Sequence, residues 1–145
     1  MTDTNIDALD NTFQKTNAWL NDLMEEMGES DRQNAFSALS AVLHALRDNL
    51  TVDEAAQLGA QLPTLITGVY YQGWKPAATP VRERRLDSFI ERVDAELRNR
   101  RLVIDAHNAA ESVFRVLSKR VTEGEIEDVI GLLPSELKQL WPKAA

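Results

Sequence analysis

The chain has 145 residues, of which 16 are basic and 23 acidic, so its formal net charge is -7 at neutral pH. It contains no cysteine, which excludes disulfide bonds, iron–sulfur clusters, thiolate zinc sites and a cysteine nucleophile. No apolar run approaches the roughly 20 residues of a membrane helix, and the acidic opening MTDTNIDALD does not resemble a signal peptide. We therefore expect one cytoplasmic domain over residues 1–145, without membrane contact and with a core of its own.

The apolar residues of the first half recur every three or four positions, which predicts amphipathic helices. Gly28 follows the first periodic segment, as expected of a C-terminal cap, and Asp31 precedes the second, as expected of an N-cap. The expected helices are Ile6 to Met27 (one long helix or two), Asp31 to Asp48, Val52 to about Gln61, and a short one that ends near Gly73.

The segment Trp74 to Val81, with the sequence WKPAATPV, is expected to be extended because Pro76 and Pro80 are incompatible with a helix interior. Helical spacing resumes after it. The apolar stripes of the expected helices in the second half begin at Leu86 and Val103, and two further helices follow Thr122 and Pro134. The chain is thus predicted to be all-α, with about eight helices.

Two tetrapeptides have the form of a capping box, Thr51 to Glu54 and Thr122 to Glu125. In such a box the threonine hydroxyl accepts from the amide three residues later, and the glutamate accepts from the cap amide. The alternative is a catalytic pair formed by Glu54 and Glu125. We favour the structural role, because each glutamate lies in the first turn of a helix, where the helix dipole stabilises negative charge.

The second half repeats the first at a shift of 71 positions, which superposes the two boxes. It also superposes Pro63 on Pro134, and each proline is expected to end one helix and orient the next. We expect a first repeat over about 5–74, a linker over about 75–81 and a second repeat over about 82–142. Each repeat is too short for a generous core, so the two should pack about a pseudo-twofold axis as one compact bundle.

Further shared pieces extend the repeat. They are Leu50-Thr51 to Glu54, Gln61-Leu62-Pro63 and Gly73-Trp74 in the first half, and Val121-Thr122 to Glu125, Leu132-Leu133-Pro134 and Leu140-Trp141 in the second. From about Trp19 to Trp141, the combination resembles the bacterial family named domain of unknown function 2267. The resemblance implies an all-helical bacterial protein with a globin-like bundle topology, without an assigned activity or catalytic residues. Leu132 departs from the pattern, where a glutamine would match Gln61, and this argues against a paired role for Gln61.

The two histidines are the side chains that titrate nearest neutral pH. His44 is expected to be exposed or half-exposed, because it lies off the apolar stripe of its helix, and His107 to be a hydrogen-bonded residue on the flank of its stripe. The alternative for both is cofactor binding, with haem ligation in a globin-like bundle. No metal-site spacing, phosphate loop or nucleophile elbow occurs, so we predict no catalytic residue, metal or cofactor.

Charge is distributed unevenly along the chain. Residues 1–74 hold 3 basic and 11 acidic side chains, whereas residues 75–145 hold 13 and 12. Arginines cluster from Arg82 to Arg101, and Arg98, Arg100 and Arg101 are candidates for binding another protein or the acidic half of another copy. The alternative is a solvated helix face with interleaved carboxylates. The net charge argues against nucleic acid as a partner.

Aromatic residues concentrate at Tyr70, Tyr71 and Trp74, followed by Lys75. Such side chains anchor interfaces, so all four are candidate contact residues, with Tyr71 expected to be the more exposed tyrosine. The alternative is that Trp74, like Trp141, closes the core. We expect a protein-binding or assembly module without catalytic activity. The alternative is a carrier of a small molecule or haem-like cofactor, with a pocket between the halves and His107 at its edge.

Overall fold

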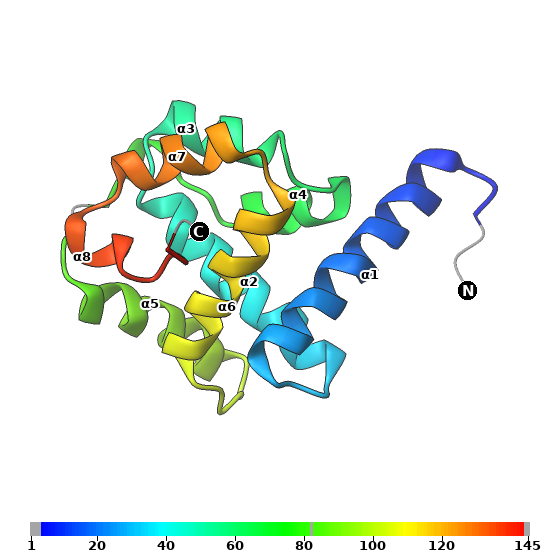
Figure 1. The fold of residues 1–145 in the computed structure, drawn as a ribbon, viewed down its shortest axis with the longest axis horizontal. Helices are drawn as coiled ribbons and strands as arrows, with labels where there is room; N and C mark the ends of the chain where they lie inside the picture. The colour runs from blue at the N-terminus through cyan, green and yellow to red at the C-terminus, as the bar shows by residue number, and fades with distance from the viewer. Residues whose placement is uncertain (1–3, 82, 144–145) are drawn as a thin grey trace.

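The structure, a computed structural model, describes residues 4–81 and 83–143. This part of the chain forms eight α-helices and one 3-10 turn, with no strand, which confirms the all-α prediction. The elements are α1 (Asp7–Met27), α2 (Arg32–Asp48), α3 (Val52–Gly59), α4 (Thr64–Tyr71), η1 (Pro76–Ala78), α5 (Leu86–Asn99), α6 (Ala106–Arg120), α7 (Glu123–Leu132) and α8 (Ser135–Lys138). Helices α2 and α6 lie in the middle of the bundle, and the others surround them (Figure 1).

Most helix ends follow from the caps in the sequence. Gly28 ends α1 with a φ of 71°, a conformation that glycine adopts without strain. Asp31 caps α2 by accepting hydrogen bonds from two amides of the first turn. Thr51 and Thr122 cap α3 and α7 in the same way, each through its hydroxyl. These four caps confirm where the helices begin or end.

The start of α6 differs from the expectation. Asp105 caps this helix by accepting a hydrogen bond from the amide of Asn108 at 3.1 Å. Val103 therefore lies in the loop before α6 and is fully exposed. The expectation that Val103 opens the buried stripe of this helix is wrong, because the cap at Asp105 fixes the helix start at Ala106, three residues after Val103.

The core is built around the contacts of α2 and α6. Helix α2 packs against α1, α4, α5 and α6, and α6 packs against α1, α5 and α7. The ring of Trp141 stacks on Phe114 with centroids 4.2 Å apart, so Trp141 closes the core as expected. Trp74 is half-buried and packs against the same core. None of the helices in the described ranges combines the length and apolar character needed to cross a bilayer.

Related helices of the two expected repeats begin at corresponding positions. Val52 and Glu123 begin α3 and α7, and Thr64 and Ser135 begin α4 and α8. A twofold exchange of the halves would pair α3 with α7 and α2 with α6, and both contacts occur. It would also turn the contact of α1 with α6 into a contact of α5 with α2, and both of these occur as well. The duplication and the globin-like topology stay predictions.

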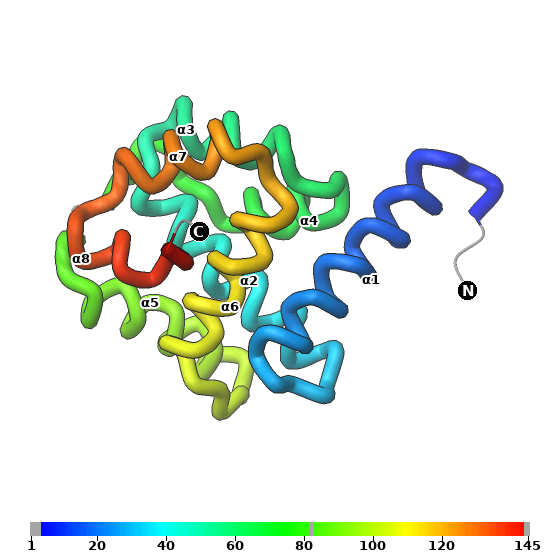
Figure 2. The backbone as a smooth tube through the Cα atoms, in the orientation of Figure 1, coloured from blue at the N-terminus to red at the C-terminus, as the bar shows by residue number. Residues whose placement is uncertain are grey.

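The first turns of α1 extend away from the rest of the bundle (Figure 2). The buried side chains of this helix begin at Thr12, whose hydroxyl accepts a hydrogen bond from the amide of Leu65 at 2.9 Å. Ile6, just before the helix, and Leu9 within it precede that point and are 54% and 41% exposed. The apolar face of α1 therefore continues past the part that the bundle covers.

Candidate functional site

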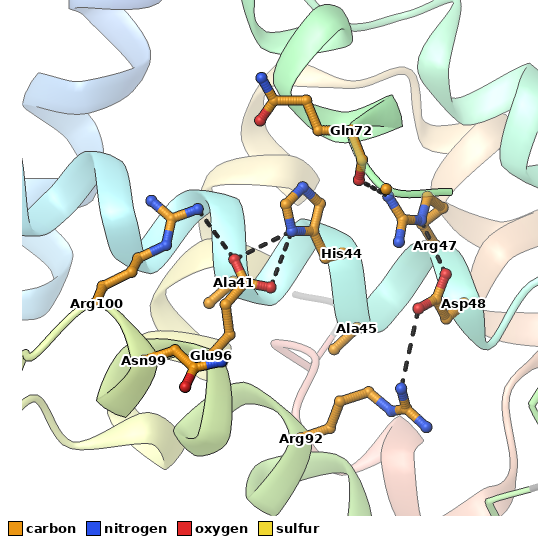
Figure 3. Close-up of a pocket in the computed structure, with 11 residues that line it drawn as sticks. Ala41, His44, Ala45, Arg47, Asp48, Gln72, Arg92, Glu96, Asn99 and Arg100 are labelled. Atoms are coloured by element: carbon orange, nitrogen blue, oxygen red, sulfur yellow. Dashed lines mark hydrogen bonds and ion pairs between the residues drawn. The ribbon is translucent and has the colours of Figure 1, made fainter. Parts of the chain in front are cut away.

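A pocket of about 430 Å³ opens between α2, α5 and the residues that follow α4 (Figure 3). It lies between the two expected repeats, since α2 and α4 belong to the first and α5 to the second. Its charged or titratable lining residues are His44, Arg47, Asp48, Arg92, Glu96 and Arg100. We call these six residues the charged pocket.

His44 contacts two acceptors from its place on α2. Its Nε2 lies 2.7 Å from the carbonyl oxygen of Val69, and its Nδ1 lies 2.9 and 3.1 Å from the two carboxylate oxygens of Glu96. A backbone carbonyl only accepts hydrogen bonds, so Nε2 donates to Val69, and Nδ1 faces the carboxylate of Glu96. His44 therefore joins α2 to α4 and α5. It is half-buried, as its place off the apolar stripe predicts.

Glu96 is held in its ionised form. Burial alone would raise the pKa of this carboxyl, but the hydrogen bond and charge of His44, together with Arg100, outweigh burial and lower the pKa below its ordinary value. Arg100 lies 3.1 Å from Glu96 Oε2. His44 and Arg100, both candidates from the sequence, thus contact the same carboxylate, that of Glu96. The contact with His44 could not be predicted from the residue spacing within α5, because His44 lies on another helix.

Arg47 is the buried cation of the pocket, at 3% exposed. It donates to the carbonyl oxygens of Tyr70 and Gln72 at 2.8 and 2.7 Å, and its Nε lies 2.9 Å from a carboxylate oxygen of Asp48. These two carbonyls lie at the C-terminal end of α4, where helical partners are missing and positive charge is stabilising. Arg47 therefore has a structural role that the sequence analysis did not identify.

A second cluster lies where α3 packs against α7. Glu54 and Glu125 are only 8% and 7% exposed, and their carboxylate oxygens lie within 4.8 Å of each other and of exposed Asp128. We call these three residues the acidic cluster. The structure thus brings together the two glutamates that the sequence analysis considered as a carboxylate pair.

The glutamate half of the predicted capping boxes does not form. At α7 the cap amide of Thr122 instead donates to Gln61 Oε1 at 3.0 Å, and Gln61 Nε2 donates to the Thr122 hydroxyl at 3.0 Å. In the described part of the chain, Oε2 of Glu54 and of Glu125 has no hydrogen-bond partner. The packing of α3 on α7 turns both carboxylates toward each other, so this part of the prediction is wrong.

Gln61 has a role despite its mismatch in the repeat. Its two hydrogen bonds tie the end of the first repeat's α3 segment to the cap of α7. Leu132 occupies the equivalent place in the second repeat, and it is 46% exposed. The first repeat therefore contributes this glutamine contact to the second, and Leu132 cannot contribute an equivalent one to the first.

The shared environment of the acidic cluster opposes ionisation. Burial, then the hydrogen bond and charge of Glu54, then the charge of Asp128 raise the pKa of Glu125 to about 8. Among the described residues, no lysine, arginine or histidine is paired with any of the three carboxylates. The protein therefore offers no cationic side chain among the described residues to offset these acidic groups.

Tyr70, Tyr71 and Trp74, which we call the aromatic corner, serve mainly in packing. Tyr70 is completely buried, and its hydroxyl donates to the carbonyl of Ala55 at 2.8 Å. Tyr71 and Trp74 are half-buried and stack with centroids 5.2 Å apart, whereas Lys75 is exposed. Tyr70 is therefore not available to a partner, contrary to its proposed role, because α3 covers it. Tyr71 is the more exposed tyrosine, as expected.

The arginine-rich segment is largely paired with its own carboxylates. Arg98 lies 2.9 Å from Asp94, one helical turn earlier, as the alternative of a solvated face predicts. Arg101 is exposed at the end of α5. Arg82 lies outside the described residues.

His107 is exposed, and its Nδ1 lies 3.3 Å from a carboxylate oxygen of Glu111 on the same helix. It borders a surface groove of about 610 Å³ between α5 and α6. Both helices belong to the second expected repeat, so this groove does not lie between the repeats.

The structure is that of a small all-helical protein, in which the charged pocket ties α2 to α4 and α5 and the acidic cluster lies between α3 and α7. Residues 16–140 match the family described as uncharacterized conserved protein (DUF2267), and the chain belongs to this family. The match confirms the resemblance seen in the sequence. No curated protein matches the chain.

Proposed function

We propose that the protein is a non-catalytic assembly module of the bacterial cytoplasm that binds further copies of itself. The observation that carries the proposal is the uncovered apolar face at the start of α1. Ile6 and Leu9 are 54% and 41% exposed, and they continue the face that is buried from Thr12 onward. An exposed apolar surface in line with a packed one is typical of a contact site.

The loop between α5 and α6 offers a complementary surface on another copy. Val103 is fully exposed there, and Arg100 and Arg101 lie just before it and are exposed. The start of α1 carries Asp7, which is exposed, so an apolar contact flanked by opposite charges can form. Charge complementarity of this kind fixes orientation and partner choice.

The two surfaces belong to different parts of the chain, so the contact is heterologous, with the start of α1 on one copy against the α5–α6 loop on the next. Such contacts form rings when the rotation closes and open chains when it does not. The excess of acidic residues in the first half, 11 against 3 basic, favours the same pairing of first half with second half.

Sedimentation velocity over a concentration series tests the proposal. The wild-type chain is expected to associate at concentrations on the order of 100 µM, and Leu9→Lys is expected to remain monomeric. Leu132→Lys is the matched control, because Leu132 is 46% exposed but lies on α7, away from both surfaces. A wild-type chain that stays monomeric throughout the series would overturn the proposal.

A carrier of a small molecule is the second candidate, favoured by the place of the charged pocket between the expected repeats. Arg92 and Arg100 at its rim suit a ligand with a carboxylate or phosphate group. Both nitrogens of His44 are engaged, so a haem iron would have to displace one of these contacts. Native mass spectrometry of gently purified protein tests this candidate: an added mass of a few hundred daltons would support it, and a bare chain would count against it.

A further inference from the structure

The acidic cluster holds carboxylate oxygens that the protein leaves without partners. Oε2 of Glu54 and Oε2 of Glu125 are buried and accept no hydrogen bond from the described residues. Burying an unpartnered polar atom costs free energy, and burying an unpaired charge costs more. Two such atoms at one helix contact indicate that a positively charged species completes it.

The spacing of the oxygens fits one cation. All three carboxylates supply an oxygen within 4.8 Å of the other two. Two oxygens that bind one Ca²⁺ at 2.3–2.6 Å can be at most about 5.2 Å apart. Three oxygens that lie 4.8 Å apart are about 2.8 Å from their common centre, so small side-chain movements would bring them to the 2.3–2.6 Å of Ca²⁺, and Mg²⁺ would require larger ones.

The donors also restrict the chemistry. Carboxylate oxygens alone suit hard divalent cations such as Ca²⁺, Mn²⁺ and Mg²⁺, and they do not suit metals that prefer sulfur. Exposed Asp128 leaves one side of the cluster open to solvent, so an ion can enter and keep water ligands. Glu54 comes from α3 and the other two ligands from α7, so a bound ion would fasten one helix to the other.

We propose that Glu54, Glu125 and Asp128 form a binding site for a hard divalent cation that fastens α3 to α7. Binding would neutralise two buried carboxylates and satisfy their free oxygens in a single step. The site is separate from the assembly surfaces, so it can be present or absent whatever the oligomeric state.

The test uses the full chain, treated with a chelator and then titrated with MnCl₂ near pH 8, with bound Mn²⁺ measured by calorimetry and electron paramagnetic resonance. We expect one Mn²⁺ per chain, displaced by Ca²⁺. Glu125→Gln is expected to abolish binding, and Asp128→Asn to weaken it by about tenfold or more, because each removes one charged ligand. Asp128 is exposed, so its variant is expected to keep the fold.

Glu127→Gln is the matched control, since Glu127 is an exposed glutamate of the same helix outside the cluster. It should bind Mn²⁺ as the wild type does. The proposal is overturned if the wild type binds no more Mn²⁺ than Glu125→Gln. It is also overturned if Glu127→Gln lowers binding as much as Asp128→Asn does, because the ions would then be attracted by net charge alone. In either case a proton shared by Glu54 and Glu125 would account for the contact.

Discussion

His44 on α2 and Glu96 on α5 are 52 positions apart in the sequence, and His44 Nδ1 lies 2.9 Å from a carboxylate oxygen of Glu96. The other ring nitrogen reaches the carbonyl of Val69 on α4. One side chain thus holds three helices, and its contacts cross the boundary between the expected repeats. His44 could bind a metal or a haem iron only by losing its contact with α4 or with α5.

Replacing Glu96 by Gln should destabilise the protein by about 1–2 kcal/mol near pH 6, because the negative charge that strengthens its contacts with His44 and Arg100 is lost. The folded-state pKa of Glu96 is lowered from 4.5, so its stabilisation is present above that value and disappears as the pH falls further. Urea unfolding of the wild type and the variant at about pH 6 and about pH 3.5 measures the destabilisation and its loss at low pH. Exposed Glu91→Gln on the same helix is the control. An equal loss at both pH values would contradict the ion pair.

Replacing Glu125 by Gln should stabilise the chelator-treated protein in alkaline solution. The folded-state pKa of Glu125 is raised from 4.5 to about 8, so the folded state is favoured at low pH and loses stability as the pH rises through this range. The glutamine variant escapes that loss. Its melting temperature should exceed that of the wild type by several degrees near pH 9, and this advantage should be absent near pH 4.

The matched control for this prediction is Glu123→Gln, an exposed glutamate in the first turn of α7. Its melting temperature should follow that of the wild type at both pH values. An advantage of Glu125→Gln that is equally large near pH 4 would show that the carboxyl is not repelled by its neighbours.

Replacing Gly59 by Ala should destabilise the protein by about 1–3 kcal/mol through overpacking. An added Cβ would collide with the hydroxyl of Tyr71 and lie 2.8 Å from its Cζ. The ring cannot move aside freely, because it stacks on Trp74. Gly68→Ala on α4 meets open space and should be stabilising by about 0.5–1 kcal/mol. Chemical denaturation of both variants compares them, and equal effects would argue against the aromatic corner as a packing element.

Local signals in the sequence were sufficient to predict most of the helix ends. Gly28, Asp31, Thr51 and Thr122 each act within one turn of the chain, so their capping roles could be predicted without knowing the fold. Val103 was wrongly assigned to α6 because the apolar spacing of this helix extends back to Val103, before the cap. The cap at Asp105 determines where α6 begins. Local chemistry outweighed periodicity at that position.

The clusters could not be predicted in the same way, because their partners lie far apart in the sequence. Glu54 and Glu125 match the capping-box pattern, but the contact of α3 with α7 and the side chain of Gln61 determine where they point. His44 was placed on the correct face of α2, but its partner Glu96 depends on how α5 packs. The 71-residue repeat could have suggested that Glu54 and Glu125 meet, since equivalent residues near a twofold axis approach each other.

The most direct test of the assembly proposal mixes two variants that are each deficient in one surface. Leu9→Lys keeps the α5–α6 loop, and a chain with Arg100→Glu, Arg101→Glu and Val103→Lys keeps the start of α1. Native mass spectrometry should find each variant alone as a monomer and the mixture as a one-to-one heterodimer, because one intact surface of each kind remains. A mixture that stays monomeric, or either variant that associates alone as the wild type does, would contradict a contact between the start of α1 and the α5–α6 loop.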